Sequence, residues 1–96
     1  METFVKHDQN KPQYSLIPPM ALREEAKVLT FGARKYSREN WRNCDDLNRY
    51  LDAAMRHIEA YRMEEVLDPE SGLHHLAHAR CCLAFLMELD GSLSKI

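Results

Sequence analysis

Apolar residues recur at helical spacing in three segments of the chain, and no segment shows the strict alternation of a half-buried strand. The first segment runs from about Pro19 to Lys35, with proline in the first turn, where a helix tolerates it. The second runs from about Asp46 to Val66 and the third from about Gly72 to Leu89. The pattern predicts an all-α fold, a small bundle of three main helices. The faces expected to be buried carry Leu22, Ala26, Leu29, Ala33 and Tyr36 in the first helix, and Leu47, Leu51, Ala54, Ile58 and Tyr61 in the second.

Two stretches interrupt the helical pattern. Residues 1–17 are polar and then punctuated by proline, which disfavours helix and predicts an extended N-terminal arm. "LDPESG", residues 67–72, separates the second and third helices and predicts an antiparallel hairpin, with Ser71 or Glu70 capping the third helix. We therefore expect a single domain over residues 1–96, divided into an arm (1–17), a helical bundle (18–90) and a tail (91–96).

The third predicted helix is apolar on most sides. Leu76, Leu83 and Met87 form one apolar side, and Cys82 and Phe85 belong to another. Two short helices can hardly cover such a helix, so we expect a homo-oligomer, most simply a dimer or a dimer-based assembly, with this helix near its centre. Adjacent Cys81 and Cys82 fall inside the apolar pattern and are expected to be reduced packing residues.

Composition narrows the functional classes. The formal net charge is −2 and charges of both signs are mixed along the chain, which is not the basic signature of a protein that binds duplex nucleic acid. No stretch is apolar enough for a signal peptide or a membrane span, so no membrane partner is expected. We expect a soluble, cytoplasmic protein.

The third helix begins with three of the five histidines, in the string "DPESGLHHLAHA". His78 can share a helix face with His74 or with His75. A hairpin would place His74 and His75 beside the Glu64 end of the second helix, with His57 one to two turns further along, near the level of His78 or beyond. Imidazoles together with the carboxylates of the connection suit a divalent ion: oxygen ligands for Mg²⁺ or Mn²⁺, nitrogen for Mn²⁺ or Zn²⁺. Two alternatives compete, direct contact with a ligand and simple helix capping with hydrogen bonds across the hairpin. His74 is expected to be the most dispensable of the three. The carboxylates expected at the closed end of the hairpin are Glu64, Glu65, Asp68 and Glu70.

A second group of side chains has the opposite charge. The end of the first helix and the residues after it combine cations for phosphate with flat rings for a base, the two components of a nucleotide site. The alternative is a solvated helix end at which basic residues offset the dipole and Trp41 fills the core. The residues concerned are Arg34, Lys35, Tyr36, Arg38, Asn40 and Trp41.

Several motifs in fixed order resemble one family. "KPQYSLIPP", "EEAKVLTFGARKY", "NW", "RH" and "DPESGLHHLAHA" are similar to the small phage domain described as the N-terminal domain of dATP/dGTP diphosphohydrolases. The resemblance covers about residues 11–89 and implies an all-α fold, a phage protein in the bacterial host cytoplasm, and handling of purine deoxynucleotides. Carried over by resemblance, the residues of interest are Lys11, Lys27, Lys35, Tyr36, Asn40, Trp41, His57, Asp68, Glu70, His75 and His78.

Related all-α pyrophosphohydrolases of the MazG type hold Mg²⁺ with an ExxE pair on one helix and an ExxD pair on the next. Here His75 and His78 stand where the resemblance places the ExxD acids, and the second helix has no ExxE pair. The catalytic residues are therefore not identified from the sequence.

Three functional hypotheses follow. In the first, the protein is a metal-dependent diphosphohydrolase that splits dGTP or dATP into monophosphate and pyrophosphate. Lys11, Lys27, Arg34, Lys35, Tyr36, Asn40 and Trp41 would then bind the nucleotide, and His57, Asp68, Glu70, His75 and His78 would hold Mg²⁺ or Mn²⁺. In the second, a non-catalytic oligomer sequesters a cyclic nucleotide that the host uses as an immune signal. In the third, the chain is an accessory subunit without a ligand.

Overall fold

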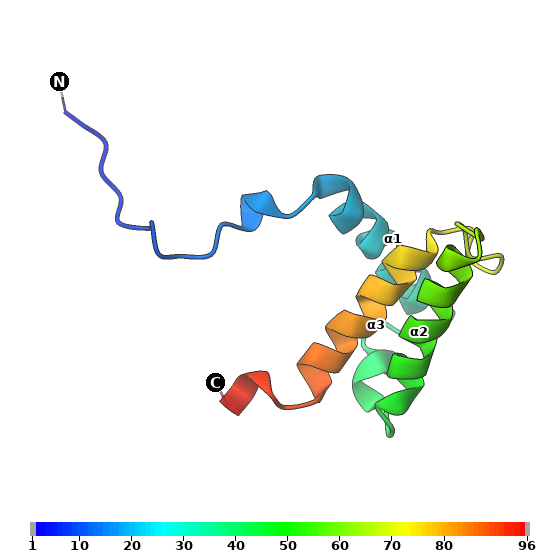
Figure 1. Cartoon of the computed structure of the whole chain (residues 1–96). Helices are drawn as coiled ribbons and strands as arrows, with labels where there is room; N and C mark the ends of the chain where they lie inside the picture. Colours follow the sequence, from blue (N-terminus) through cyan, green and yellow to red (C-terminus); the bar gives the residue numbers. More distant parts are fainter. Residues whose placement is uncertain (1, 96) are drawn as a thin grey trace.

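The computed structural model describes residues 2–95, which form three α-helices and three short 3₁₀ helices (Figure 1). The order is η1 (Tyr14–Leu16), α1 (Pro19–Lys35), η2 (Asn40–Asn43), α2 (Asn48–Arg62), α3 (His75–Leu89) and η3 (Leu93–Lys95). Within residues 2–95 the only β pairing is an isolated bridge between Leu67 and His74. The all-α prediction is therefore confirmed. None of the helices described is both long and apolar enough to cross a membrane.

Helix α1 has the predicted bounds. Pro19 occupies its first position, where the missing N–H of proline leaves no hydrogen bond unmade. Arg34 and Lys35 lie in its last turn, where positive charge offsets the negative end of the helix dipole. This helix end brings two cations to the start of the next segment.

Helix α2 is shorter than predicted at both ends. It starts at Asn48, whose backbone N–H donates to Asp46 Oδ1 at 3.0 Å, so the aspartate lies before the helix. It ends at Arg62 because Glu64 adopts a positive φ of 70° and the Glu65 N–H donates to the Ala60 carbonyl at 3.0 Å. This is the hydrogen-bond pattern of a Schellman C-cap, which closes the helix four residues before the predicted Val66.

Helix α3 begins at His75, and the residue that caps it is His74. The backbone of His74 is extended, and its Nδ1 accepts a hydrogen bond from the Leu76 N–H at 3.0 Å. The prediction that Ser71 or Glu70 would cap this helix is wrong, because the bridge between Leu67 and His74 keeps residues 71–73 outside it. His74, expected to be the most dispensable of the three histidines, is the residue that caps this helix.

Helices α2 and α3 run in opposite directions from their connection, and α3 also packs against α1 (Figure 1). Arg80 on α3 donates to Glu25 Oε2 on α1 at 3.1 Å, which ties these two helices together. The core is made of small side chains, which allow the helices to approach closely. The buried hydrophobic residues are Val28, Ala54, Ala77, Ala79, Cys81 and Cys82. Cys81 and Cys82 are thus buried free thiols, as predicted.

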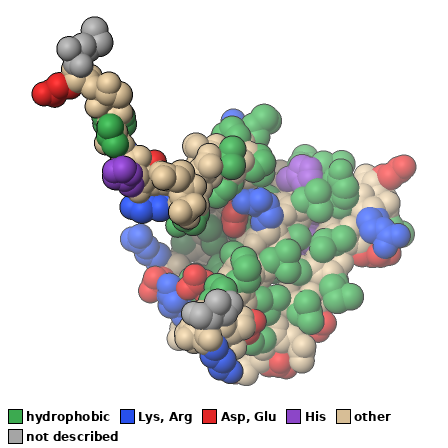
Figure 2. Space-filling model, turned by 60° about the vertical axis from the view of Figure 1, so that its left-hand side comes forward, with side chains coloured by type: hydrophobic (Ala, Val, Ile, Leu, Met, Phe, Trp, Pro, Cys, Tyr) green, Lys and Arg blue, Asp and Glu red, His purple; other side chains and the backbone are tan. Residues whose placement is uncertain are grey.

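Much of the predicted buried face is exposed. Leu22 and Leu29 of α1 are 51% and 41% exposed, and Leu51 and Ile58 of α2 are 42% and 39% exposed. The periodicity correctly identifies one apolar stripe on α1 and one on α2. Three short helices are too few to enclose both of these stripes. Figure 2 shows hydrophobic side chains gathered over one side of the helices. The extended arm, the division into segments and the homo-oligomer stay predictions.

Candidate functional site

A cleft of about 1040 Å³ lies between α1 with the segment that follows it and the α2/α3 pair. One wall is formed by α1 from Val28 onward and by residues 36–42; the other carries side chains from α2, the connection and α3. The two groups of side chains singled out in the sequence therefore face one cavity. The predicted site residues that line it are Arg34, Lys35, Tyr36, Asn40, Trp41, His57, Asp68, Glu70 and His78.

One ion pair joins the two walls of this cleft. Lys35, in the last turn of α1, forms an ion pair with Glu70 of the α2–α3 connection. The hydrogen bond that Lys35 donates to Glu70, and then its interaction with Tyr36, raises the pKa of Lys35 above its ordinary value. Lys35 is therefore charged, and another anion could take the place of Glu70 as its partner.

The rings in the cleft differ in how firmly they are held. Trp41 stacks on Phe85 with ring centroids 4.6 Å apart, and the Arg42 guanidinium lies 4.3 Å from the Trp41 ring. Tyr50 packs against Phe85 at 5.0 Å. Tyr36, by contrast, is 64% exposed. Trp41 is consequently fixed in the wall, and Tyr36 has a ring surface open to a ligand.

The histidines form a connected group at the α2/α3 wall of the cleft. His57 Nδ1 lies 2.8 Å from His75 Nδ1, and the His57 ring stacks on that of His78 with centroids 4.6 Å apart. His75 Nε2 lies 2.7 Å from Glu65 Oε1. Helix α2 therefore contacts both histidines of α3 through a single imidazole.

Ser71 links His78 to Asp68. Its hydroxyl donates to Asp68 Oδ2 at 3.0 Å and accepts from the Leu73 N–H at 3.1 Å. Because its one proton goes to Asp68, it accepts the proton of His78 Nε2, 2.7 Å away. This network fixes the His78 tautomer with its proton on Nε2.

The environment shifts the pKa values of three groups in this cluster. Burial lowers the pKa of His57, and the nearby His78 and His75 lower it further. Burial likewise lowers the pKa of His78, against the opposing effect of Asp68. Burial acts to raise the pKa of Asp68, but the two hydrogen bonds from Ser71 outweigh it and leave that pKa lowered. At neutral pH the lowered pKa values favour neutral imidazoles at His57 and His78 beside an ionised Asp68 carboxylate.

Three predicted residues lie outside the cleft lining. Lys11 is exposed on the segment before α1, and Lys27 is engaged with Glu24 at 3.0 Å on the surface of α1. His75 is 4% exposed and lies behind His57. A single chain thus brings neither Lys11 nor Lys27 to the other candidate nucleotide-binding residues.

Sequence reasoning missed or misassigned three contributors to the site. Phe85 fits the apolar period of α3 and was expected to be only packing, and Arg42 lies one residue beyond the selected basic group. Glu65 was expected only as one of several acids near the hairpin. Its pairing with His75 depends on the positive φ of Glu64, which the residue type gives no sign of.

A smaller group within the cluster has the donors for a cation. His57, Asp68 and His75 each offer one ligand atom, and these atoms all lie within 4.8 Å of one another. Glu70 pairs with Lys35, and His78 with Ser71, so these two predicted metal ligands are engaged elsewhere. Two nitrogens and one oxygen fit Mn²⁺ or Zn²⁺ better than Mg²⁺, which prefers oxygen.

Comparison with known proteins agrees with the resemblance in the sequence. Residues 1–95 match the family described as "dATP/dGTP diphosphohydrolase, N-terminal". A protein of Salmonella phage PMBT28 named "dATP/dGTP diphosphohydrolase" is 42% identical over 87 residues, which cover 91% of this chain and 30% of the phage protein. The chain therefore spans about a third of the length of this relative. No solved structure matches. The chain belongs to the family of dATP/dGTP diphosphohydrolase N-terminal domains.

Proposed function

We propose that this domain binds a purine nucleotide in the cleft and has a dATP/dGTP diphosphohydrolase-like role in nucleotide handling. The observation that carries the proposal is the placement of Arg34, Lys35 and the exposed Tyr36 ring on one wall of a single cavity. Its volume of about 1040 Å³ lies at the upper end of the range for small-molecule sites, roughly 300–1,000 Å³. A nucleoside triphosphate or a cyclic dinucleotide needs a site of this size.

The phosphates are assigned to the end of α1. A helix C-terminus repels anions, so a phosphate is held there only by side-chain cations. Lys35 supplies one, and a phosphate would replace the Glu70 carboxylate as its partner. Arg34 supplies a second and is able to bind a phosphate with two parallel hydrogen bonds. Asn40 adds a neutral polar side chain from η2.

The base is assigned to Tyr36. Trp41, the other candidate, already stacks on Phe85 and contacts Arg42, whereas most of Tyr36 is exposed. Stacking of a base on an aromatic ring contributes about 1–3 kcal/mol and tolerates either purine. We therefore expect Tyr36 to set affinity more than specificity.

Hydrolysis is the candidate that follows from the name of the phage relative, together with the group of His57, Asp68 and His75. In this proposal His57, Asp68 and His75 would hold a divalent ion, which when bound would lower the pKa of a water and so activate it for attack on the phosphoanhydride. Arg34 and Lys35 neutralise the developing charge, and the products are the monophosphate and pyrophosphate.

Binding without chemistry is the second candidate, and the state of the carboxylates favours it. Glu70 is held by Lys35, Asp68 accepts two hydrogen bonds from Ser71, and Glu65 is paired with His75. No pair of carboxylates within residues 2–95 faces the cleft in the manner of a two-helix Mg²⁺ site. In this proposal the domain sequesters an intact cyclic nucleotide that serves as a host immune signal.

One set of measurements tests the proposal. We expect calorimetry of the whole chain to detect binding of dGTP, dATP or a cyclic dinucleotide, with Mn²⁺ present or after treatment with a chelator. Chromatography of the ligand after incubation then separates the candidates: monophosphate with pyrophosphate indicates hydrolysis, and intact ligand indicates sequestration. Absence of binding for every nucleotide, with and without the ion, overturns nucleotide binding and leaves the accessory subunit.

Variants locate the site. Tyr36→Ala removes the stacking surface and is expected to weaken binding about 5- to 150-fold, the equivalent of the 1–3 kcal/mol above. Tyr36→Phe keeps the ring and is the matched control, for which we expect nearly unchanged affinity. Equal affinity of Tyr36→Ala and the unmodified chain places the base elsewhere.

A further inference from the structure

We propose that His57, Asp68 and His75 form a binding site for a divalent transition-metal ion, such as Zn²⁺ or Mn²⁺, with Glu65 as the residue that orients His75. The three candidate ligands come from α2, from the α2–α3 connection and from the first position of α3. Their ligand atoms lie within 4.8 Å of one another only because the hairpin is closed. The site is therefore a property of the folded chain. The proposal does not depend on nucleotide binding.

Proton positions in the cluster show how an ion is accommodated. Glu65 Oε1 lies 2.7 Å from His75 Nε2, and an ionised carboxylate can only accept, so the proton of His75 is on Nε2. His75 Nδ1 then presents a lone pair. His57 Nδ1, 2.8 Å away, donates its proton to that lone pair. One proton thus holds two imidazole nitrogens together at the centre of the cluster.

A divalent ion takes the place of this shared proton. When His57 carries its proton on Nε2 instead of Nδ1, both Nδ1 lone pairs are free to bind the ion, and both rings stay neutral. The contact of Glu65 with His75 is the carboxylate–histidine arrangement that fixes the tautomer and orientation of metal-bound imidazoles. Glu65 is 55% exposed, so it acts from the surface without entering the core.

Asp68 supplies the third ligand. The two hydrogen bonds from Ser71 both go to Oδ2, and no donor within residues 2–95 reaches Oδ1. The hydrogen bonds to Oδ2 hold the carboxylate in place, which leaves the other oxygen for the ion. Because Asp68 and His57 also line the cleft, the proposed ion lies at the cleft wall.

The ligand types determine which ion is bound. Mg²⁺ requires mainly oxygen ligands in octahedral geometry and keeps several waters, whereas Zn²⁺ and Mn²⁺ accept imidazole nitrogen. Two of the three candidate ligands are imidazoles, a set of donors that Mg²⁺ disfavours. We expect the order of affinity Zn²⁺ > Mn²⁺ > Mg²⁺.

Calorimetry tests the site without reference to any activity. The whole chain is stripped with a chelator and titrated with Zn²⁺, Mn²⁺ and Mg²⁺, and thermal unfolding is followed at each ion concentration. We expect one equivalent of Zn²⁺ per chain and a midpoint of unfolding that rises with Zn²⁺, because the ion binds only the folded hairpin. Absence of Zn²⁺ binding, or binding of Mg²⁺ as tight as that of Zn²⁺, overturns the proposal.

Three variants locate the ion. His57→Ala and Asp68→Asn each remove one ligand and are expected to abolish both the stoichiometric heat and the rise in midpoint. Glu65→Gln keeps a hydrogen-bond acceptor but not the charge, and we expect it to weaken binding about 10- to 100-fold. Because Glu65 is on the surface, this variant reports on the site even where removal of a ligand unfolds the chain.

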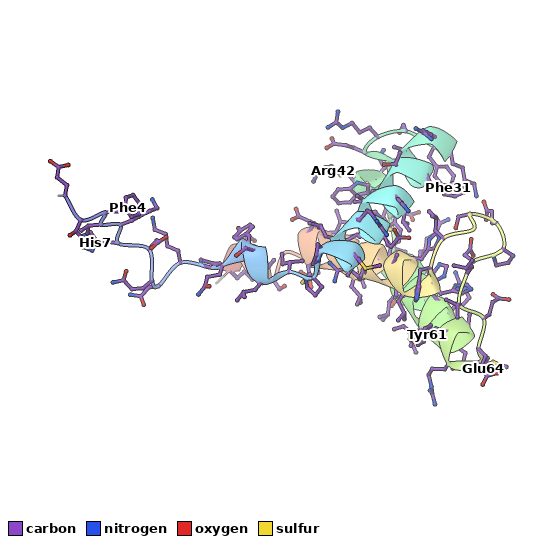
Figure 3. All side chains as sticks on the ribbon, turned by 90° about the horizontal axis from the view of Figure 1, so that it is seen from above. Phe4, His7, Phe31, Arg42, Tyr61 and Glu64 are labelled. Atoms are coloured by element: carbon purple, nitrogen blue, oxygen red, sulfur yellow. The ribbon has the colours of Figure 1, made fainter. Side chains whose placement is uncertain are left out.

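The control is His7→Ala. His7 lies on the segment before α1, away from the helices (Figure 3), and provides an exposed imidazole with no part in the cluster. Unchanged Zn²⁺ binding in His7→Ala together with its loss in His57→Ala supports the site. The reverse result, or unchanged binding in both Asp68→Asn and Glu65→Gln, assigns the bound ion to another group and overturns it.

Discussion

Ser71 holds the α2–α3 connection together through a single hydroxyl group. It contacts Asp68, His78 and the backbone N–H of Leu73 within 3.1 Å. Its backbone N–H also donates to Asp68 Oδ2 at 2.8 Å. The geometry of the histidine cluster therefore depends on a residue that touches neither His57 nor His75.

Replacement of Ser71 by alanine removes all three contacts of the hydroxyl. His78 Nε2 and the Leu73 N–H are left without their acceptor in a half-buried position, which costs about 1–3 kcal/mol. We expect urea unfolding of Ser71→Ala, at fixed protein concentration, to give a free energy of unfolding lower by this amount. Ser37→Ala is the matched control, since Ser37 is exposed and makes no side-chain hydrogen bond among residues 2–95. A loss in Ser71→Ala no larger than in the control shows that the hydroxyl network is not formed.

The residue types predicted which residues belong to the site better than they predicted which of these residues contact one another. Arg34, Lys35 and Tyr36 are consecutive, so any helix ending there presents them together, and the sequence suffices. The stacking of Trp41 on Phe85 joins residues 44 positions apart and depends on how η2 meets α3. His75 was predicted with His78 as a possible ligand pair, and its observed contacts are Glu65 and His57. The contact with Glu65 depends on the positive φ of Glu64, which the helical period does not reveal.

At the level of elements, the predicted helix boundary is right where a covalent constraint sets it, and wrong where hydrogen bonds set it. Pro19 fixes the start of α1 through its ring, and the prediction there is confirmed. The end of α2 is decided by Glu64, which lies at the tip of that helix in Figure 3 and has a φ of 70°. Glutamate is a good helix former, so residue type predicts continuation through Glu64 and Glu65. The Schellman hydrogen bonds and the bridge from Leu67 to His74 outweigh that preference.

Glu64→Gly tests this C-cap. Glycine adopts a positive φ without the steric cost of a Cβ atom, about 1–2 kcal/mol, part of which its greater freedom in the unfolded chain offsets. We expect a net gain in the free energy of unfolding of up to about 1 kcal/mol, measured by urea unfolding with an unchanged m value.

Glu59→Gly is the matched control for this change. Glu59 lies within α2, where glycine is expected to cost about 1 kcal/mol relative to a good helix former. The two substitutions therefore have opposite signs although both replace glutamate by glycine. Destabilisation by Glu64→Gly of the same size as by Glu59→Gly contradicts the positive φ at Glu64.

At the scale of the whole molecule, the accessible surface is larger than a compact monomer of this mass exposes. The chain has a mass of 11.2 kDa and exposes 8107 Å². A compact monomer of that mass exposes roughly 5,700 Å² by the usual scaling, so the excess is about 2,400 Å². The segment before α1 contributes part of it, with Phe4 and Tyr14 87% and 79% exposed. Stable homodimers cover about 1,000–2,500 Å² per chain, which matches this excess.

A second copy of the chain is the partner that this surface predicts. Leu83 and Met87 on α3 are 44% and 56% exposed, although α3 is the most apolar helix and already packs on α1 and α2. Covering such side chains contributes about 25 cal/mol per Å² of apolar surface, which favours association and offsets part of its entropy cost. We expect light scattering after size exclusion to give a mass that is a multiple of 11.2 kDa.

Leu83→Glu is expected to shift that mass towards the monomer, because the carboxylate would be buried without a partner. Glu88→Gln changes an exposed residue of the same helix and should leave the mass unchanged. A mass of 11.2 kDa at every concentration contradicts the prediction, because all the exposed leucines would then face water.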